Sequence, residues 1–203
     1  MTRGAKRSAW SILTAVSATV IALTGCGGGG PVGDPGLVGN PPVAASGQRL
    51  AFAYFQQCVN PIFSSKLPNP NGGGTTNTCA AGGCHDYTTG TGGALRIIPN
   101  LNPVALTDTP DVIRASDMYK NFLSAQGEVV IGAPAQSLLL NKPLLQNVLH
   151  GGGLIFPNDQ DPHVKLIQYW ISHPAPQGQD EFSTATYGMF TPADPNIGVC
   201  NTN

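Results

Sequence analysis

Two cysteines and a histidine stand together in the stretch Cys79-Ala-Ala-Gly-Gly-Cys84-His85, in a chain that otherwise has its cysteines far apart. A close cysteine pair followed directly by histidine is typical of covalent haem attachment, in which both sulfurs bond the porphyrin and the histidine binds iron. The usual spacing has two residues between the cysteines, whereas this chain has four. Because these four are alanine and glycine, the longer loop has little steric cost. We therefore predict one haem c, bound through Cys79 and Cys84, with His85 as an axial ligand.

A second axial ligand is expected among the remaining histidines and methionines. Three glycines follow His150, and they allow the backbone to approach a flat macrocycle closely. We therefore predict His150 as the second ligand, with Met118 and Met189 as the alternatives. We expect His163 and His173, at the two ends of a predicted helix, to be solvated.

The His150-Gly-Gly-Gly run also matches the oxyanion loop of lipases and esterases. Such an enzyme needs a Gly-x-Ser-x-Gly nucleophile elbow, and the sequence contains none. The sequence also shows no acid–base pair or nucleophile triad. We therefore expect neither an enzyme nor a small-molecule substrate.

The first 25 residues have the pattern of a bacterial export signal. Three basic residues precede an apolar run at 9–23, which is too short to span a bilayer comfortably, and Leu-Thr-Gly precedes Cys26. This end resembles the lipobox of bacterial lipoproteins, which implies cleavage before Cys26, lipidation of that cysteine and a periplasm-facing protein anchored in the cell envelope. Gly27, in place of the aspartate of an inner-membrane retention signal, favours the outer membrane. The alternative is an ordinary secretory signal with an incidental cysteine.

The composition predicts a loop-rich domain after a tether. Glycine and proline together number 44 of 203 residues, below the level of about 25–30% that is typical of disorder. Residues 26–46 contain four consecutive glycines and several prolines, which predicts a flexible lipidated tether. We expect a compact domain over 47–177 and a polar C-terminal tail over 178–203. The net charge of −1 provides no basic field for nucleic acid.

Apolar residues at helical spacing predict a mostly helical fold. The first helix is expected directly after residue 46, and Pro61 should end or kink it. Further helices are expected at 115–124, as a short turn at 138–140, and from Asp161-Pro162, an N-cap and first-turn proline, to Pro174.

The remaining cysteines predict a disulfide. If Cys26 carries lipid and Cys79 and Cys84 carry haem, then Cys58 and Cys200 are the two that remain. Disulfides form in exported proteins, so this pair is expected to pin the tail to the first helix.

Two other interpretations of the cysteine pair stay open. In one, Cys79 and Cys84 form a second disulfide, and no haem is bound. In the other, Cys79, Cys84, His85 and His150 hold a zinc ion, because zinc sites accept similar cysteine spacings.

The order of these pieces resembles a c-type cytochrome domain of the kind found in large periplasmic and planctomycete-type proteins. The resemblance covers residues 52–176, although a Met-Pro-Pro segment often found before the final helix is absent. It implies a small helical domain in which the first and last helices pack beside one haem. The matching pieces are Pro61-Ile62-Phe63, Cys84-His85, Gly92-Gly93, Ser137-Leu138-Leu139-Leu140 before Lys142-Pro143, His150-Gly151-Gly152-Gly153 and Trp170-Ile171.

The resemblance implies a membrane-tethered monohaem cytochrome that carries single electrons between redox partner proteins of the envelope. The alternative, from a different class, is a non-redox lipoprotein stapled by disulfides, which acts as a binding or assembly module.

Overall fold

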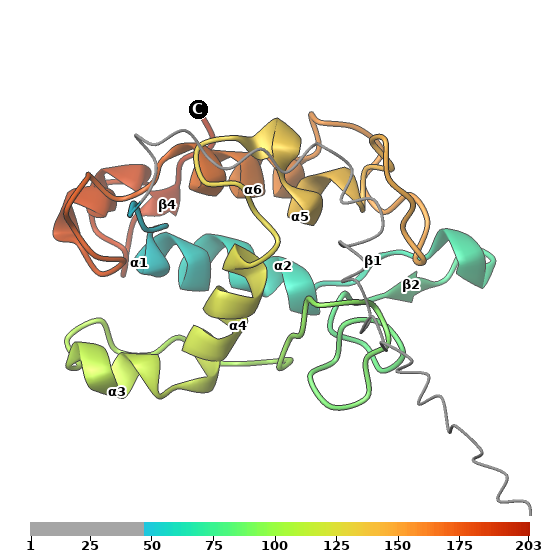
Figure 1. Ribbon diagram of the computed structural model, residues 1–203, viewed down its shortest axis with the longest axis horizontal. Coiled ribbons are helices and arrows are strands. Elements are labelled where there is room, and N and C mark those ends of the chain that lie inside the picture. Colours follow the sequence, from blue (N-terminus) through green and yellow to red (C-terminus); the bar gives the residue numbers. More distant parts are fainter. Residues whose placement is uncertain (1–46) are drawn as a thin grey trace, which may run out of the picture. The chain divides into compact units, whose positions relative to one another are not determined.

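The computed structural model describes residues 47–203, which are helix-rich with few strands and long loops (Figure 1). This is compatible with the predicted class, mostly α and loop-rich. The predicted signal peptide (1–25) and tether (26–46), with Cys26, lie outside the described residues. None of the helices in the described part is long and apolar enough to cross a membrane.

In chain order the elements are α1 (Phe52–Tyr54), a π-helical turn (Phe55–Val59), α2 (Asn60–Ser64), β1 (Leu67–Pro68), a 3₁₀ turn (Pro70–Gly72), β2 (Thr76–Asn77), α3 (Pro110–Arg114), α4 (Asp117–Gln126), a 3₁₀ turn (Pro134–Gln136), α5 (Leu138–Asn141), α6 (Pro162–Ser172), a 3₁₀ turn (Thr184–Met189), β3 (Phe190–Thr191) and β4 (Val199–Cys200).

The first helix begins at Phe52, later than predicted. Leu50 and Ala51, just before it, are buried and non-helical. The Phe52 amide donates a hydrogen bond to the Glu181 carbonyl at 2.9 Å, and the Ala175 amide donates to the Arg49 carbonyl at 2.7 Å. An earlier helix start would need this amide and this carbonyl. Trp170 Nε1 also donates to the Ala51 carbonyl at 3.0 Å, which holds this segment against α6.

Of the two predicted effects of Pro61, an end or a kink, the helical segment does not end there but is locally distorted. The chain widens into a π turn just before it, where the Asn60 amide donates to the Phe55 carbonyl five residues back. Pro61 then occupies the start of α2, where its missing N–H leaves no helical bond unmade. The segment therefore continues to Ser64 with a change of hydrogen-bond register.

The other predicted helices are confirmed. The helix α4 starts two residues later than predicted, after Ser116, whose hydroxyl accepts from the Tyr119 amide at 3.1 Å. The short turn at the leucines is α5. The helix α6 starts at Pro162, and the carboxylate of Asp161 accepts from the His163 amide at 2.8 Å.

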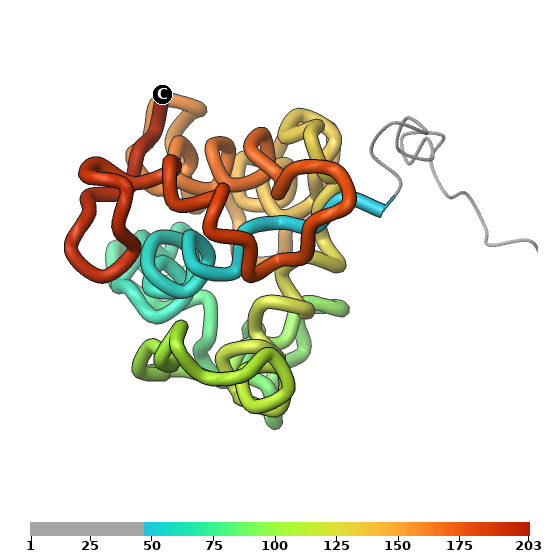
Figure 2. Tube along the Cα trace, turned by 90° about the vertical axis from the view of Figure 1, so that its left-hand side faces the viewer, coloured from blue at the N-terminus to red at the C-terminus, as the bar shows by residue number. Residues whose placement is uncertain are grey.

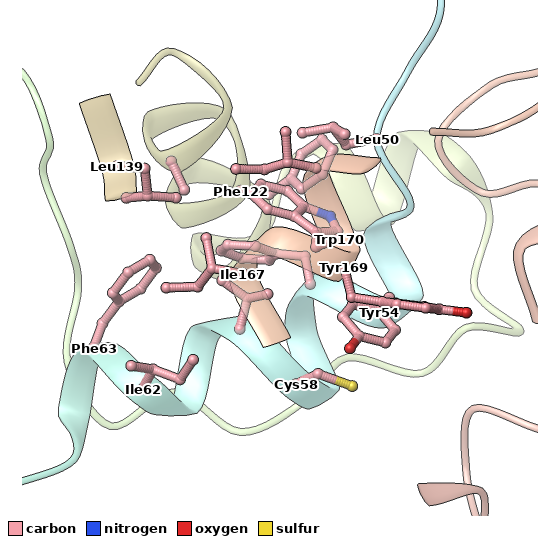
Figure 3. Packing of buried hydrophobic residues seen from close by; sticks show 14 of the residues in the cluster. Leu50, Tyr54, Cys58, Ile62, Phe63, Phe122, Leu139, Ile167, Tyr169 and Trp170 are labelled. Atoms are coloured by element: carbon pink, nitrogen blue, oxygen red, sulfur yellow. The ribbon is translucent and has the colours of Figure 1, made fainter. Parts of the chain in front are cut away.

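The core lies between the first helical segment and the helices on either side of it. In Figure 1, α1 and α2 run between α4 and the pair α5 and α6. The Phe55 ring centre lies 5.3 Å from that of Trp170 on α6 and 5.4 Å from that of Phe122 on α4. Figure 3 shows Ile167 and Trp170 pointing at the first segment. Burial of these large aromatic residues stabilises the packing of the first and last helices.

The C-terminal segment is part of this core and is joined to the first helical segment by the predicted disulfide. Cys58 and Cys200 are bonded, with their Cα atoms 6.0 Å apart, which confirms the pairing. Cys200 lies on β4, which pairs antiparallel with β3, and Phe190 on β3 packs against Tyr54. Figure 2 shows this segment in red alongside the first segment in cyan.

A buried carboxylate fixes the start of the same segment. Glu181 is 3% exposed and accepts hydrogen bonds from Tyr119 Oη at 2.7 Å and from Arg114 Nε at 2.9 Å. Burial alone would raise the pKa of Glu181, but these two donors outweigh it, and the pKa is lowered. The guanidinium of Arg114 also lies over the Phe182 ring, 5.0 Å from its centre.

Candidate functional site

All four predicted cofactor-binding residues line one cavity of about 680 Å³. Cys79, Cys84 and His85 come from the loop after β2, and His150 comes from the loop after α5. The volume falls in the range of about 300–1,000 Å³ that is typical of small-molecule and cofactor sites. Much of the wall is apolar and is supplied by the first helical segment, α5, α6 and the loops between them: Ile62, Phe63, Leu67, Leu95, Leu139, Ile155, Phe156 and Ile167.

The four residues between the cysteines fold into a closed turn. The His85 amide donates to the Cys79 carbonyl at 2.9 Å, which brings the two ends of the motif together. Gly83 has a φ of +81°, a conformation that glycine adopts without strain. The Ala80 amide donates to the Phe63 carbonyl at 3.0 Å, so the turn is attached to the end of the first helical segment.

The imidazole of His85 is held in place by the segment that follows it. Its Nδ1 lies 3.2 Å from the Leu95 carbonyl, and the Ile97 amide donates to the His85 carbonyl at 2.7 Å. Gly92 packs so closely that a Cβ there would lie 2.8 Å from Cε1 of the ring. Burial lowers the pKa of His85, and the hydrogen bond from the ring to Leu95 opposes this only in part, so the ring is neutral at pH 7.

The imidazole of His150 is held by its own loop. Its Nδ1 lies 2.9 Å from the Gly153 carbonyl, and the Gly153 amide donates back to the His150 carbonyl at 2.9 Å. A Cβ on Gly152 would lie 3.0 Å from Cε1 of the ring, closer than side chains ordinarily pack. The sequence predicted that these glycines let the backbone approach a flat ring closely. In the structure, the backbone at Gly152 approaches the imidazole of His150.

The two imidazoles are nearly parallel, and their spacing is that of two ligands on opposite sides of one metal ion. Their ring centres lie 6.2 Å apart, and their planes are inclined by only 8°. Imidazole nitrogens bind metal ions at about 2.0–2.1 Å, and a ring nitrogen lies about 1.1 Å from the ring centre, so two imidazoles on opposite sides of one ion have centres about 6.2–6.4 Å apart. The spacing of His85 and His150 matches this value.

Both rings also have the hydrogen bond that fixes a metal-binding tautomer. A carbonyl oxygen only accepts, so the contacts of His85 to Leu95 and of His150 to Gly153 place the proton on Nδ1 of each ring. The lone pair of each Nε2 is then available for a metal. Metal-binding histidines almost always donate their other ring N–H in this way.

The two cysteines of the motif are free thiols. Burial raises the pKa of Cys79 to about 12, so its sulfur is uncharged at neutral pH and packs as an apolar group. The Cys79–Cys84 disulfide of the competing interpretation is absent from the described residues. Over 47–203, no three histidine, cysteine or acidic side chains gather in a group that could hold a metal ion.

The remaining candidates lie elsewhere. Met118 is 2% exposed and Met189 is 4% exposed, and both are core residues that do not line the cavity. Nδ1 of His163 lies 3.1 Å from its own helix cap, Asp161. His173 stacks on Tyr169 at 3.9 Å at the end of α6.

The cavity also contains residues that the sequence did not single out. Lys142 and Glu128 form an ion pair across its wall, with Nζ and Oε2 3.7 Å apart. The carbonyl of Leu95, which orients the His85 ring, belongs to the run Leu-Arg-Ile. Apolar and polar residues alternate in this run, and this alternation is the one sequence signal that the segment packs against its neighbour. Asn71 reaches the cavity from the loop between β1 and β2, and no sequence pattern indicates it.

Comparisons of the chain with protein-family models, with curated proteins and with solved structures found no match. What the site can do therefore follows from its own geometry. Two imidazoles of matched spacing, two unpaired thiols and an apolar wall surround one cavity. These residues fit a flat, largely apolar macrocycle that carries a single metal ion and is attached through sulfur.

Proposed function

We propose that this domain binds one haem c and carries single electrons. In this proposal Cys79 and Cys84 hold the porphyrin through their sulfurs, and His85 and His150 are its axial ligands. The observation that carries the proposal is the pair of nearly parallel imidazoles with centres 6.2 Å apart. Bound haem would supply the one-electron chemistry, while the protein supplies orientation, ligands and burial.

The wall of the cavity supports the same function. Its apolar side chains exclude water from a bound macrocycle, which reduces the reorganisation that accompanies a change of charge. Two histidine ligands give a lower reduction potential than the His/Met pair, since methionine raises it. The hydrogen bonds of His85 and His150 to backbone carbonyls hold both rings ready, so binding needs little reordering of side chains.

The wider proposal is a c-type cytochrome-like domain on a lipid tether. The packing of the first and last helices beside the cavity supports it. Lipidation of Cys26 would anchor the chain in the bacterial envelope on the periplasmic side, and its partners would be other redox proteins. Turnover of a small-molecule substrate is not part of the proposal.

Co-expression of the full chain with the bacterial haem c maturation machinery tests the attachment. The purified protein should be red, with a sharp Soret band and the added mass of one haem retained after denaturation. The variant with Cys79→Ser and Cys84→Ser should fold but lose the covalent mass. Colourless wild-type protein with an intact fold would reject the electron carrier and favour a non-redox envelope module.

Replacement of His150 tests the axial pair. His150→Ala should convert the low-spin spectrum to a high-spin or mixed one, because the sixth position of the iron loses its ligand. His173→Ala removes a histidine that does not line the cavity, and it should leave the spectrum unchanged. Identical spectra for the two variants would refute His150 as the ligand.

A further inference from the structure

The position of the His150 ring depends on where its loop lies. Both hydrogen bonds that orient the ring are internal to the turn from His150 to Gly153. They fix the ring relative to the turn but leave the turn free to move as a unit. The exposed fraction of the preceding residue, Leu149, is 92%, so that side chain does not anchor the turn.

The chain just after the turn is held by the Ile155 amide, which donates to the Pro143 carbonyl at 2.8 Å, whereas the turn itself is held by the loop between β1 and β2. Asn71 Nδ2 donates a hydrogen bond to the Gly151 carbonyl at 3.0 Å, across 80 residues of sequence. Pro70 lies beside Gly153, so that a Cβ added to this glycine would lie 3.4 Å from the proline ring. One side-chain hydrogen bond therefore joins the turn to this hairpin.

The same hairpin leads directly into the attachment motif. The strand β2 ends at Asn77, whose Nδ2 lies 3.9 Å from Sγ of Cys84, and Cys79 follows two residues later. The segment that holds the two thiols thus also holds the opposite wall of the cavity. We propose that Asn71 is the positioning residue of His150, and that its bond to Gly151 keeps the imidazole over the iron and limits access of outside ligands.

This inference rests on the proposed haem site, and it predicts a change in ligand competition. When the bond to Gly151 is lost, the turn leaves its place more often, and the fraction of molecules with an open sixth position rises. The loss of one hydrogen bond of ordinary strength changes such a population about five- to tenfold. The apparent affinity for a ligand that needs the open state rises by the same factor.

The test is a titration of the haem-loaded full chain with imidazole, followed by visible absorption. Asn71→Ala should bind imidazole about five- to tenfold more tightly than wild type, and Asn71→Leu, which keeps the bulk but has no donor, should do the same. Asn196→Ala is the matched control, because it also removes one exposed asparagine bond, to Asp194 at 3.1 Å. It should match wild type.

Hydrogen exchange separates positioning from general loosening. In Asn71→Ala, the Ile155 amide, which bonds just after the turn to the Pro143 carbonyl at 2.8 Å, should exchange faster, while the Leu139 amide, bonded to the Glu128 carbonyl at 2.9 Å, should keep its wild-type rate. Equal imidazole affinities for Asn71→Ala and Asn196→Ala in protein that holds low-spin haem would overturn this inference and leave the proposed function intact. Wild-type protein that takes up no haem would overturn both.

Discussion

Replacement of Gly92 by alanine should displace the His85 ring from its place. A Cβ at this position would lie 2.8 Å from Cε1 of the ring, 2.9 Å from its Nδ1 and 2.8 Å from the Cys84 carbonyl oxygen. Ordinary contacts begin near 3.4 Å, so the overlap amounts to about 0.6 Å on two sides at once. The ring and the turn must therefore move apart.

The cost of this movement follows from what must give way. Overpacking of this kind costs about 1–3 kcal/mol. Weakening the bond from His85 to Leu95, or that from the Gly92 amide to Cys84, adds about 1 kcal/mol. The reduced freedom of the unfolded chain returns about 0.4–1 kcal/mol. We expect Gly92→Ala to lower the free energy of unfolding by about 1–3 kcal/mol.

Two assays and two control variants show whether the effect is specific to the His85 ring. Urea denaturation of the haem-free chain gives the stability, and the visible spectrum of the haem-loaded chain reports on the ligand. Gly93→Ala adds a side chain at a φ of +83° with only Lys142 Nζ nearby, at 3.9 Å, so it should cost about 1–2 kcal/mol of backbone strain and leave the spectrum unchanged. Gly188→Ala, with nothing within 4 Å and no left-handed backbone, should be nearly neutral. If Gly92→Ala behaves like Gly188→Ala in both assays, the tight contact with His85 is not real.

Two further predictions concern the C-terminal segment. The double replacement Cys58→Ala and Cys200→Ala opens a link across 142 residues of sequence and should lower the free energy of unfolding by about 2–5 kcal/mol in urea titrations; a loss below about 1 kcal/mol would contradict it. Because the fold lowers the pKa of Glu181, its ionised form stabilises the protein above the ordinary carboxyl pKa of about 4.3, and this stability is lost as the pH falls through the lowered value. Glu181→Gln should therefore cost about 1–2 kcal/mol at pH 7, allowing for the partial exposure of its arginine partner, and little at low pH; equal losses at both pH values would refute the argument.

Features with a local cause were predictable from the sequence. Asp161 before Pro162 marks the start of α6 because a cap and a first-turn proline both act within one helical turn. The pairing of Cys58 with Cys200 followed from counting the cysteines in a chain predicted to be exported, and the structure contains that bond. The haem-binding role of the motif itself remains a prediction from its residue types.

Features that depend on tertiary contacts were not predictable. The first helix starts later than predicted because the Arg49 carbonyl and the Phe52 amide bond to groups more than 100 residues away. The place of His85 depends on the Leu95 carbonyl, and that of the second imidazole depends on an amide at Asn71. Backbone carbonyls occur at every position, so such acceptors leave no mark on the sequence.

The wide cysteine spacing has a structural use. Two extra residues between Cys79 and Cys84 cost little entropy, since doubling the length of a flexible loop costs only about 0.6 kcal/mol. In return the turn gains a buried residue, Ala80, whose amide bonds to the Phe63 carbonyl and fastens the motif to the helix that lines the cavity. The bond from the His85 amide to the Cys79 carbonyl then closes the loop, so the histidine stays beside the first cysteine despite the longer sequence. A wider spacing therefore preserves the juxtaposition of thiol and imidazole on which the haem hypothesis depends.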